Sequence, residues 1–88
     1  MEIKTSLEVY PNPVSNSTTI TFPVEQSQHV EISIYDLNGR LVTMLTDASF
    51  EKGNYEMTWN AADVNAGIYF LQFQSGENQE KIKLVVTK

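Results

Sequence analysis

The sequence predicts an all-β domain, a seven-stranded antiparallel β-sandwich of the immunoglobulin-like type. Apolar and polar residues alternate along most of the chain, which is the period expected of half-buried strands. Glycine, proline, asparagine and aspartate interrupt this alternation at short intervals. Many short strands separated by such turn residues are typical of a sandwich.

Each predicted strand is short and bounded by turn residues. The tripeptide Pro11–Pro13 ends the first strand and Pro23 ends the second, because proline cannot donate a hydrogen bond to a β-ladder. Segment 46–52 is expected to be looser, anchored by Phe50, and segment 60–66 is expected to be a loop. We expect strands at residues 7–10, 17–22, 29–35, 41–45, 53–59, 67–73 and 79–87.

A tight hairpin is predicted at Asn38-Gly39. The dipeptide lies between two extended apolar runs, and Asn-Gly is the strongest short-range hairpin signal. We expect a type I′ turn, which requires a positive φ at both Asn38 and Gly39.

Two aromatic residues are expected to organise the core. Trp59 is predicted to be its large central residue. Tyr69, in the strand opened by Gly67, is predicted to tie a loop through its hydroxyl, because a buried tyrosine hydroxyl needs a partner. In the last strand, alternation turns Ile82, Leu84 and Val86 inward and Lys81 and Lys83 outward.

The composition excludes several classes of function. Eleven acidic and six basic residues among 88 give a net charge of -5, which disfavours binding to nucleic acids and to anionic membranes. There is no cysteine, so disulfides and thiolate metal sites are excluded. No apolar run approaches the roughly 20 residues of a membrane-spanning helix.

The sequence contains no recognisable catalytic apparatus, and neither enzymatic activity nor a cofactor is expected. His29 is the single histidine and falls on the solvent face of its strand, so a histidine pair for zinc is impossible. The glycines are isolated, which excludes a phosphate-binding loop. A weak calcium site in the loop Asp63–Asn65 is left open, without the spacing that would support it.

Four markers occur in order along the chain. They are Leu7-Glu8-Val9-Tyr10-Pro11-Asn12-Pro13; Ile34-Tyr35-Asp36-Leu37-Asn38-Gly39-Arg40-Leu41-Val42; Gly53-Asn54-Tyr55 followed by Trp59-Asn60 and Ala66-Gly67-Ile68-Tyr69-Phe70; and Lys81-Ile82-Lys83-Leu84-Val85-Val86-Thr87-Lys88. Together they resemble the type A C-terminal sorting domain of the type IX (Por) secretion system of Bacteroidetes.

The resemblance implies a C-terminal secretion signal. Such a domain folds in the periplasm, is recognised by the outer-membrane translocon, and is cut from an upstream cargo protein by a sortase at the cell surface. Residues 1–6 would be the end of the linker, 7–88 the sorting domain, and a leader peptide would lie upstream. The implied recognition residues are Lys81, Lys83, Leu84, Val85, Val86 and Lys88, and the implied structural residues are Pro11, Asn12, Pro13, Asn38, Gly39, Trp59, Gly67 and Tyr69.

Two other functions remain open from the sequence. One is an immunoglobulin-like or fibronectin-like spacer of a secreted enzyme or adhesin, which would be followed by further chain, whereas a sorting signal is expected to end at Lys88. The other is a carbohydrate-binding module, which needs aligned exposed aromatic residues. Tyr10 and Tyr35 are the candidates, and both are expected to pack at strand ends instead.

Overall fold

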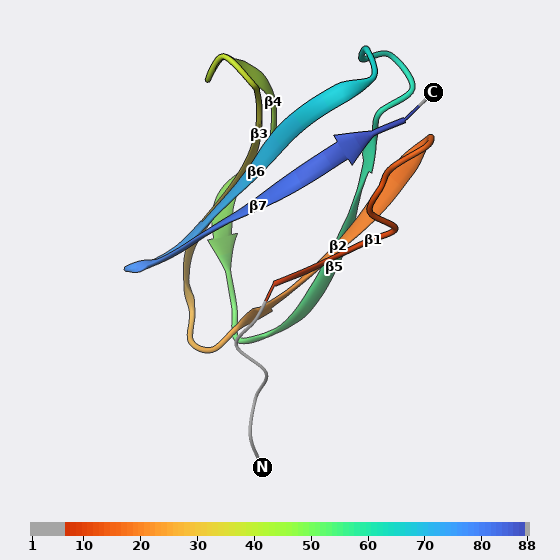
Figure 1. Cartoon of the computed structure of the whole chain (residues 1–88). Coiled ribbons are helices and arrows are strands. Elements are labelled where there is room, and N and C mark those ends of the chain that lie inside the picture. The colour runs from red at the N-terminus through yellow and green to blue at the C-terminus, as the bar shows by residue number, and fades with distance from the viewer. Residues whose placement is uncertain (1–6, 88) are drawn as a thin grey trace.

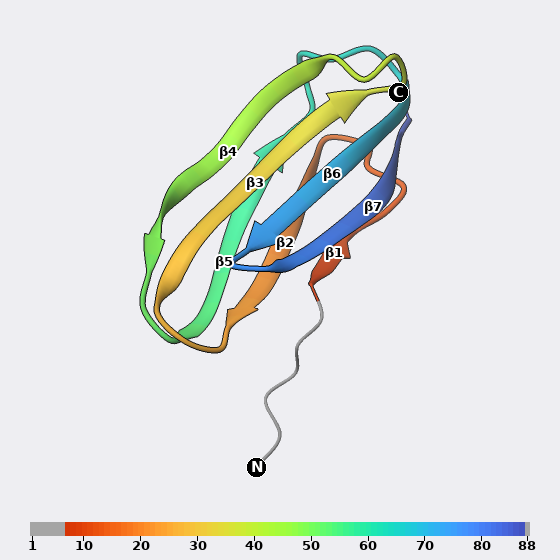
Figure 2. The same cartoon turned by 90° about the vertical axis from the view of Figure 1, so that its left-hand side faces the viewer.

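The computed structural model describes residues 7–87 and forms a sandwich of two antiparallel sheets, with no helix in this part of the chain (Figures 1 and 2). One sheet has the order β1-β2-β5 and the other the order β4-β3-β6-β7. The strands are β1 (Glu8–Tyr10), β2 (Ser17–Val24), β3 (Gln28–Asp36), β4 (Leu41–Phe50), β5 (Gly53–Asn60), β6 (Gly67–Ser75) and β7 (Asn78–Val86). The predicted fold class is confirmed.

The core lies between the two sheets and is built by alternation. Alternate residues of most strands point inward, so the apolar members of the pattern meet across the sandwich. Every buried side-chain nitrogen or oxygen within residues 7–87 has a hydrogen-bond partner. The largest buried side chains include Ile20, Phe22, Ile32, Ile34, Leu71 and Leu84.

Trp59 and Tyr69 join the two sheets. Trp59 of β5 is buried against Tyr69 of β6, with ring centroids 5.8 Å apart in an edge-to-face arrangement. The Tyr69 hydroxyl donates to the carbonyl oxygen of Asn65 at 2.7 Å. This bond fixes the loop before β6, as the tyrosine corner does in immunoglobulin-like domains. Gly67, the first residue of β6, lies opposite Val86 of β7.

The second strand is longer than the sequence predicts. Pro23 does not end it, because β2 continues to Val24 and Pro23 lies opposite Asn54 of β5. On its other side β2 pairs with β1 only from Thr19 to Thr21. The missing N–H of Pro23 therefore removes no hydrogen bond to β1.

The expectation of a looser segment at 46–52 is also wrong. Strand β4 continues to Phe50, which lies opposite Gln28 of β3. The pairing with β3 skips Val42 and Leu45, so the strand contains two bulges. An extra residue in a strand shifts the alternation, and both skipped side chains pack against the core. A search for strict alternation therefore does not recognise all of β4, because the inward residues Val42 and Leu45 are three positions apart.

The β3–β4 hairpin has a different turn from the predicted type I′. Gly39 has φ +84°, but no residue other than glycine has a positive φ in the described chain, so Asn38 does not meet the type I′ requirement. The N–H of Gly39 donates to the carbonyl oxygen of Asp36 at 3.0 Å, and the N–H of Asp36 donates to that of Arg40 at 2.9 Å. This pattern is a three-residue loop that ends in a left-handed glycine.

Asp36 explains why the hairpin has a three-residue loop and not the predicted two-residue type I′ turn. Its Oδ1 atom accepts hydrogen bonds from the backbone N–H groups of Asn38 and Arg40, both at 2.9 Å. An aspartate at the start of a turn stabilises it by accepting local amides in this way. The side chain therefore selects the three-residue loop.

Candidate functional site

The C-terminal strand β7 is an edge strand of the larger sheet. The one named strand that it pairs with in the described chain is β6, from Gly67↔Val86 to Ser75↔Asn78. Leu84 and Val86 are buried, whereas the side chains of Lys81 and Lys83 are exposed on the outer face. The strand therefore contributes one face to the core and offers the other to solvent.

The Pro11–Pro13 segment occupies the outer edge of β7. The Asn12 side chain donates from Nδ2 to the carbonyl oxygen of Lys83 at 2.9 Å and accepts from the N–H of Val85 at Oδ1, at 3.2 Å. Asn12 thus acts as a side-chain substitute for one pair of strand hydrogen bonds. The peptide bonds that precede Pro11 and Pro13 are both cis.

Val14 continues this edge pairing along the backbone. Its N–H donates to the carbonyl oxygen of Val85 at 2.7 Å, and its own carbonyl oxygen accepts from the N–H of Thr87 at 2.8 Å. Val14 is fully buried and forms a parallel bridge with Val86. In Figure 2 the chain between β1 and β2 runs beside the end of β7.

Two further bonds fasten the start of the chain. The buried Thr18 hydroxyl donates to the carbonyl oxygen of Pro11 at 2.8 Å, and the N–H of Leu7 donates to the carboxylate of Glu80 at 3.4 Å. The backbone edge of β7 from Lys83 to Thr87 is consequently occupied. A partner of the folded domain therefore cannot add a strand at this part of the edge.

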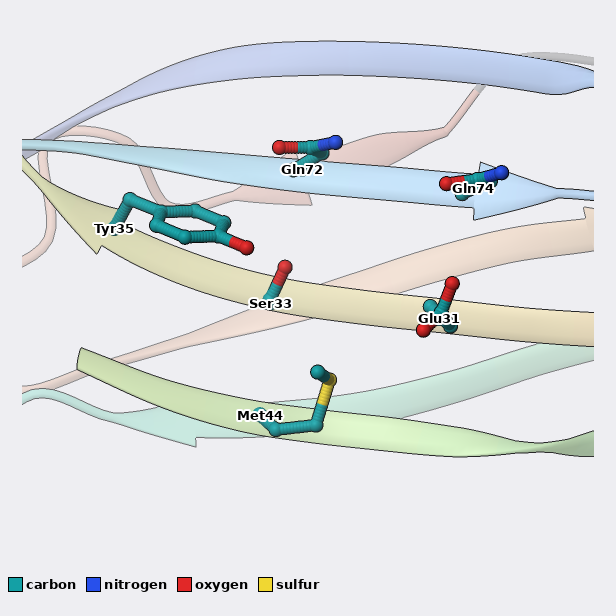
Figure 3. Close-up of a pocket in the computed structure, with 6 residues that line it drawn as sticks. All are labelled: Glu31, Ser33, Tyr35, Met44, Gln72 and Gln74. Atoms are coloured by element: carbon teal, nitrogen blue, oxygen red, sulfur yellow. The ribbon is translucent and has the colours of Figure 1, made fainter. Parts of the chain in front are cut away.

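The outer face next to β7 is hollowed. A shallow depression of about 400 Å³ extends from the β3–β4 turn to β7 and is lined by Tyr35, Asp36, Leu37, Gly39, Phe70, Gln72 and Lys81. A smaller one of about 110 Å³ adjoins it through Tyr35 and Gln72 (Figure 3). Leu37 is 65% exposed at the rim of the larger depression.

The implied recognition residues separate into three groups. Lys81 and Lys83 are exposed and Val85 is half-buried, so these three can be reached on the folded domain. Leu84 and Val86 are buried in the core and cannot be read without unfolding the strand. Lys88 lies outside the described residues, as do residues 1–6.

The aromatic residues do not form a sugar-stacking platform. Tyr10 is 52% exposed, contrary to the expectation that it packs at a strand end, whereas Tyr35 is half-buried. Among residues 7–87, Tyr10 is the one aromatic side chain in the exposed class. Tyr10 lies on the smaller sheet, away from the half-buried Tyr35 and Phe70 of the larger one, so residues 7–87 present no row of aligned exposed rings.

Two other expectations concern metals and membranes. Asp63 joins no cluster of three metal-ligating side chains in the part of the chain that the structure describes. His29, in contrast, lies beside Asp47 and Glu31. The sequence does not predict this cluster, because the expected loose segment at 46–52 leaves Asp47 outside the strands. Residues 7–87 contain no helix suited to crossing a membrane.

The described chain is thus an immunoglobulin-like sandwich whose last strand is clamped by its first residues. The family model described as "Secretion system C-terminal sorting domain" matches residues 8–87, and the chain belongs to this family. This confirms the resemblance to sorting domains of the type IX secretion system, and the chain is a C-terminal secretion signal domain. The family is one of sorting signals and not of catalysts.

Two solved structures share the fold. Dimeric latent PorU from Porphyromonas gingivalis superposes with a TM-score of 0.70 at 24% identity, over 92% of this chain and 9% of that one. PorZ, a surface component of the type IX secretion system of Porphyromonas gingivalis, superposes with a TM-score of 0.68 at 26% identity, over 93% and 11%. This chain therefore spans about a tenth of either protein. No curated protein matches it.

Proposed function

We propose that this domain directs an upstream cargo protein through the type IX translocon to the cell surface, and that it does so without catalysis. The observation that carries the proposal is the clamped C-terminal strand, in a chain that matches the sorting-domain family over residues 8–87. The clamp holds β7 in one position. The outward side chains of β7 are therefore presented in a fixed arrangement to a receptor.

Recognition of this kind needs surface complementarity and no deep pocket. Lys81 and Lys83 are two cationic side chains on one face of β7, in a protein whose net charge is -5. Lys81 and Lys83 therefore give the outer side of β7 two positive charges on a domain whose net charge is negative. Electrostatic complementarity of this type contributes mainly to specificity and to the rate of encounter.

The remaining steps follow from the same proposal. The cargo carries its own leader for passage into the periplasm, where the domain folds before it meets the translocon. The sortase then cuts in the linker that precedes Leu7 and releases the cargo at the surface. The partners are accordingly the translocon, the sortase and the cargo itself.

A transplanted signal tests the proposal. A periplasmic reporter protein is fused upstream of residues 1–88 and expressed in a type IX-competent bacterium and in a translocon-deficient strain. We expect surface exposure, measured by protease accessibility and fractionation, only when both the domain and the translocon are present. Equal surface exposure without the domain would show that it is a spacer.

A further inference from the structure

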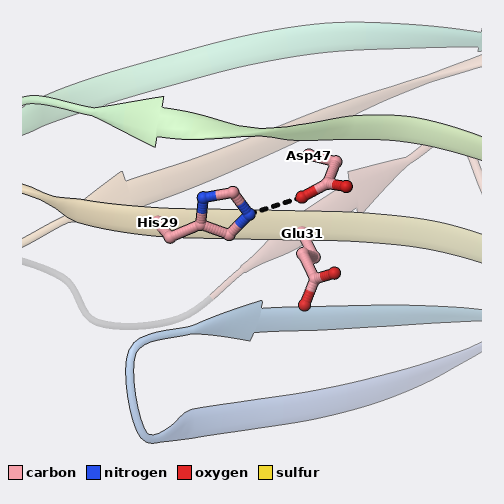
Figure 4. Close-up of side chains that lie close together, drawn as sticks. All are labelled: His29, Glu31 and Asp47. Atoms are coloured by element: carbon pink, nitrogen blue, oxygen red, sulfur yellow. Dashed lines mark hydrogen bonds and ion pairs between the residues drawn. The ribbon is translucent and has the colours of Figure 1, made fainter.

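A group of side chains of the metal-ligating kind lies on the outer face of the larger sheet, away from β7. His29 and Glu31 project from β3 and Asp47 projects from β4 (Figure 4). Each residue offers one metal-ligating atom, and these atoms lie within 4.8 Å of one another. His29 Nε2 contacts Asp47 Oδ1 directly.

The strand register brings these three residues together. His29 and Glu31 are two residues apart on β3, so they share a face. Asp47 lies directly opposite Glu31 in the β3–β4 pairing. The cluster is therefore built on two hydrogen-bonded strands and not on a loop.

The charges around the cluster favour a cation. Two carboxylates directly opposite each other on neighbouring strands destabilise the pairing. On the other side of β3, Glu31 lies opposite Gln74 of β6, which cannot neutralise it. Lys81 and Lys83 of the same sheet are on β7, with β6 between them and β3.

We propose that His29, Glu31 and Asp47 bind a divalent transition-metal ion of the Zn²⁺ class. Imidazole nitrogen favours such ions, whereas Ca²⁺ and Mg²⁺ prefer oxygen ligands alone. Zinc takes nitrogen and carboxylate oxygen at about 2.0–2.2 Å, so the ligand atoms of a tetrahedral site lie about 3.3 Å apart. The ligand atoms lie within 4.8 Å of one another, so binding requires the side chains to rotate closer together, with water as the fourth ligand.

The site is expected to be weak. The side chains of His29 and Asp47 are each 53% exposed. Water therefore competes with them for the ion, and it also solvates the two side chains when no ion is bound. The domain is built around its own apolar core and does not depend on the ion to fold. Binding therefore adds stability that grows with the logarithm of the metal concentration once this exceeds the dissociation constant, as for any ligand of the native state.

Nuclear magnetic resonance titration of the full chain with ZnCl₂ tests this site. We expect amide shifts confined to residues 28–32 and 46–48, and none of this local pattern with MgCl₂. His29→Gln and Asp47→Asn should each weaken Zn²⁺ binding at least about tenfold, because even indirect partners of a metal ligand cost that much. Both substituted side chains are exposed, so the variants should melt as the unmodified domain does without metal.

Glu56→Gln is the matched control. Glu56 is an exposed carboxylate on β5, in the other sheet, and its replacement should leave the Zn²⁺ affinity unchanged. A Zn²⁺-dependent rise in melting temperature should likewise be lost in the two cluster variants and kept in the control. Shifts spread over acidic residues of both sheets, equal affinity in all variants, or no shift at millimolar Zn²⁺ would each overturn the proposal.

Discussion

At the residue scale, Trp59 is a buried side chain that links the two sheets. It is 4% exposed and packs edge-to-face on Tyr69 of the opposite sheet. Truncating a buried tryptophan loses its burial and leaves a cavity. Trp59 therefore contributes to the packing of the two sheets at the end where β5 enters the loop to β6.

Trp59→Ala is expected to reduce the free energy of unfolding by about 3–5 kcal/mol. Chemical denaturation followed by circular dichroism measures the loss. Trp59→Phe, which keeps a ring against Tyr69, is the matched control and should lose distinctly less. A loss under about 1 kcal/mol for the alanine variant would be typical of a surface residue and would contradict this account of the core.

Gly39 is required for its backbone conformation and not for space. Its φ is +84°, and an added Cβ would meet nothing within 4 Å. Gly39→Val should cost about 1–3 kcal/mol, because a β-branched residue is strained in the left-handed region. Gly39→Asn should cost less, since asparagine tolerates that region. Equal melting temperatures for the two variants would contradict the turn assignment.

At the element scale, the clamp between the Pro11–Pro13 segment and β7 joins the two ends of the described chain. Its bonds link residues 71 and 73 positions apart. Contacts between residues so far apart in the chain leave no periodic pattern in the sequence. The Pro-Asn-Pro motif is therefore recognisable from the sequence, but its contact with β7 is not. The motif predicts the end of β1, whereas its contact with the edge of β7 depends on the three-dimensional arrangement.

Asn12→Ala is expected to loosen the end of β7. It removes one acceptor and one donor, each worth about 0.5–1.5 kcal/mol in net stability, and solvent access to this edge keeps the total near the low end. Hydrogen exchange at the Val85 amide should accelerate markedly, because that N–H donates to Asn12.

Asn12→Asp separates the two bonds of the clamp. A carboxylate still accepts from the Val85 amide but cannot donate to the carbonyl oxygen of Lys83. This variant should therefore keep more protection at Val85 than the alanine variant does. Asn54→Ala, at an exposed position of β5, is the unrelated control. Unchanged exchange at Val85 in Asn12→Ala would show that the clamp does not hold β7.

The β3–β4 hairpin shows why the cluster of His29, Glu31 and Asp47 could not be predicted from the sequence. Alternation correctly placed Val30, Ile32 and Ile34 in the core, since β3 is a regular strand. It failed on β4, where two bulges break the period. For the same reason the sequence does not predict that Asp47 lies opposite Glu31, because this position depends on the register between β3 and β4. Local patterns predict regular strands, whereas bulges and cross-strand clusters depend on the pairing partner.

At the scale of the whole molecule, the residues that fill the core and the residues proposed for recognition lie on opposite faces of β7. Leu84 and Val86 fill the core, whereas Lys81 and Lys83 point outward. Deleting residues 83–88 would remove both buried side chains together with the backbone partners of Val14. Loss of export after such a truncation would therefore report on folding as much as on recognition.

The central claim, that the outer face of β7 is the recognised surface, is tested most directly by charge reversal in the export assay. Lys81→Glu and Lys83→Glu are compared with Lys52→Glu, an exposed lysine between β4 and β5. Exposed substitutions usually change stability within about 0.5 kcal/mol, so all three variants should melt alike. We predict that the two β7 variants leave the reporter in the periplasm while the control reaches the surface. Full surface export of Lys81→Glu and Lys83→Glu would contradict the claim.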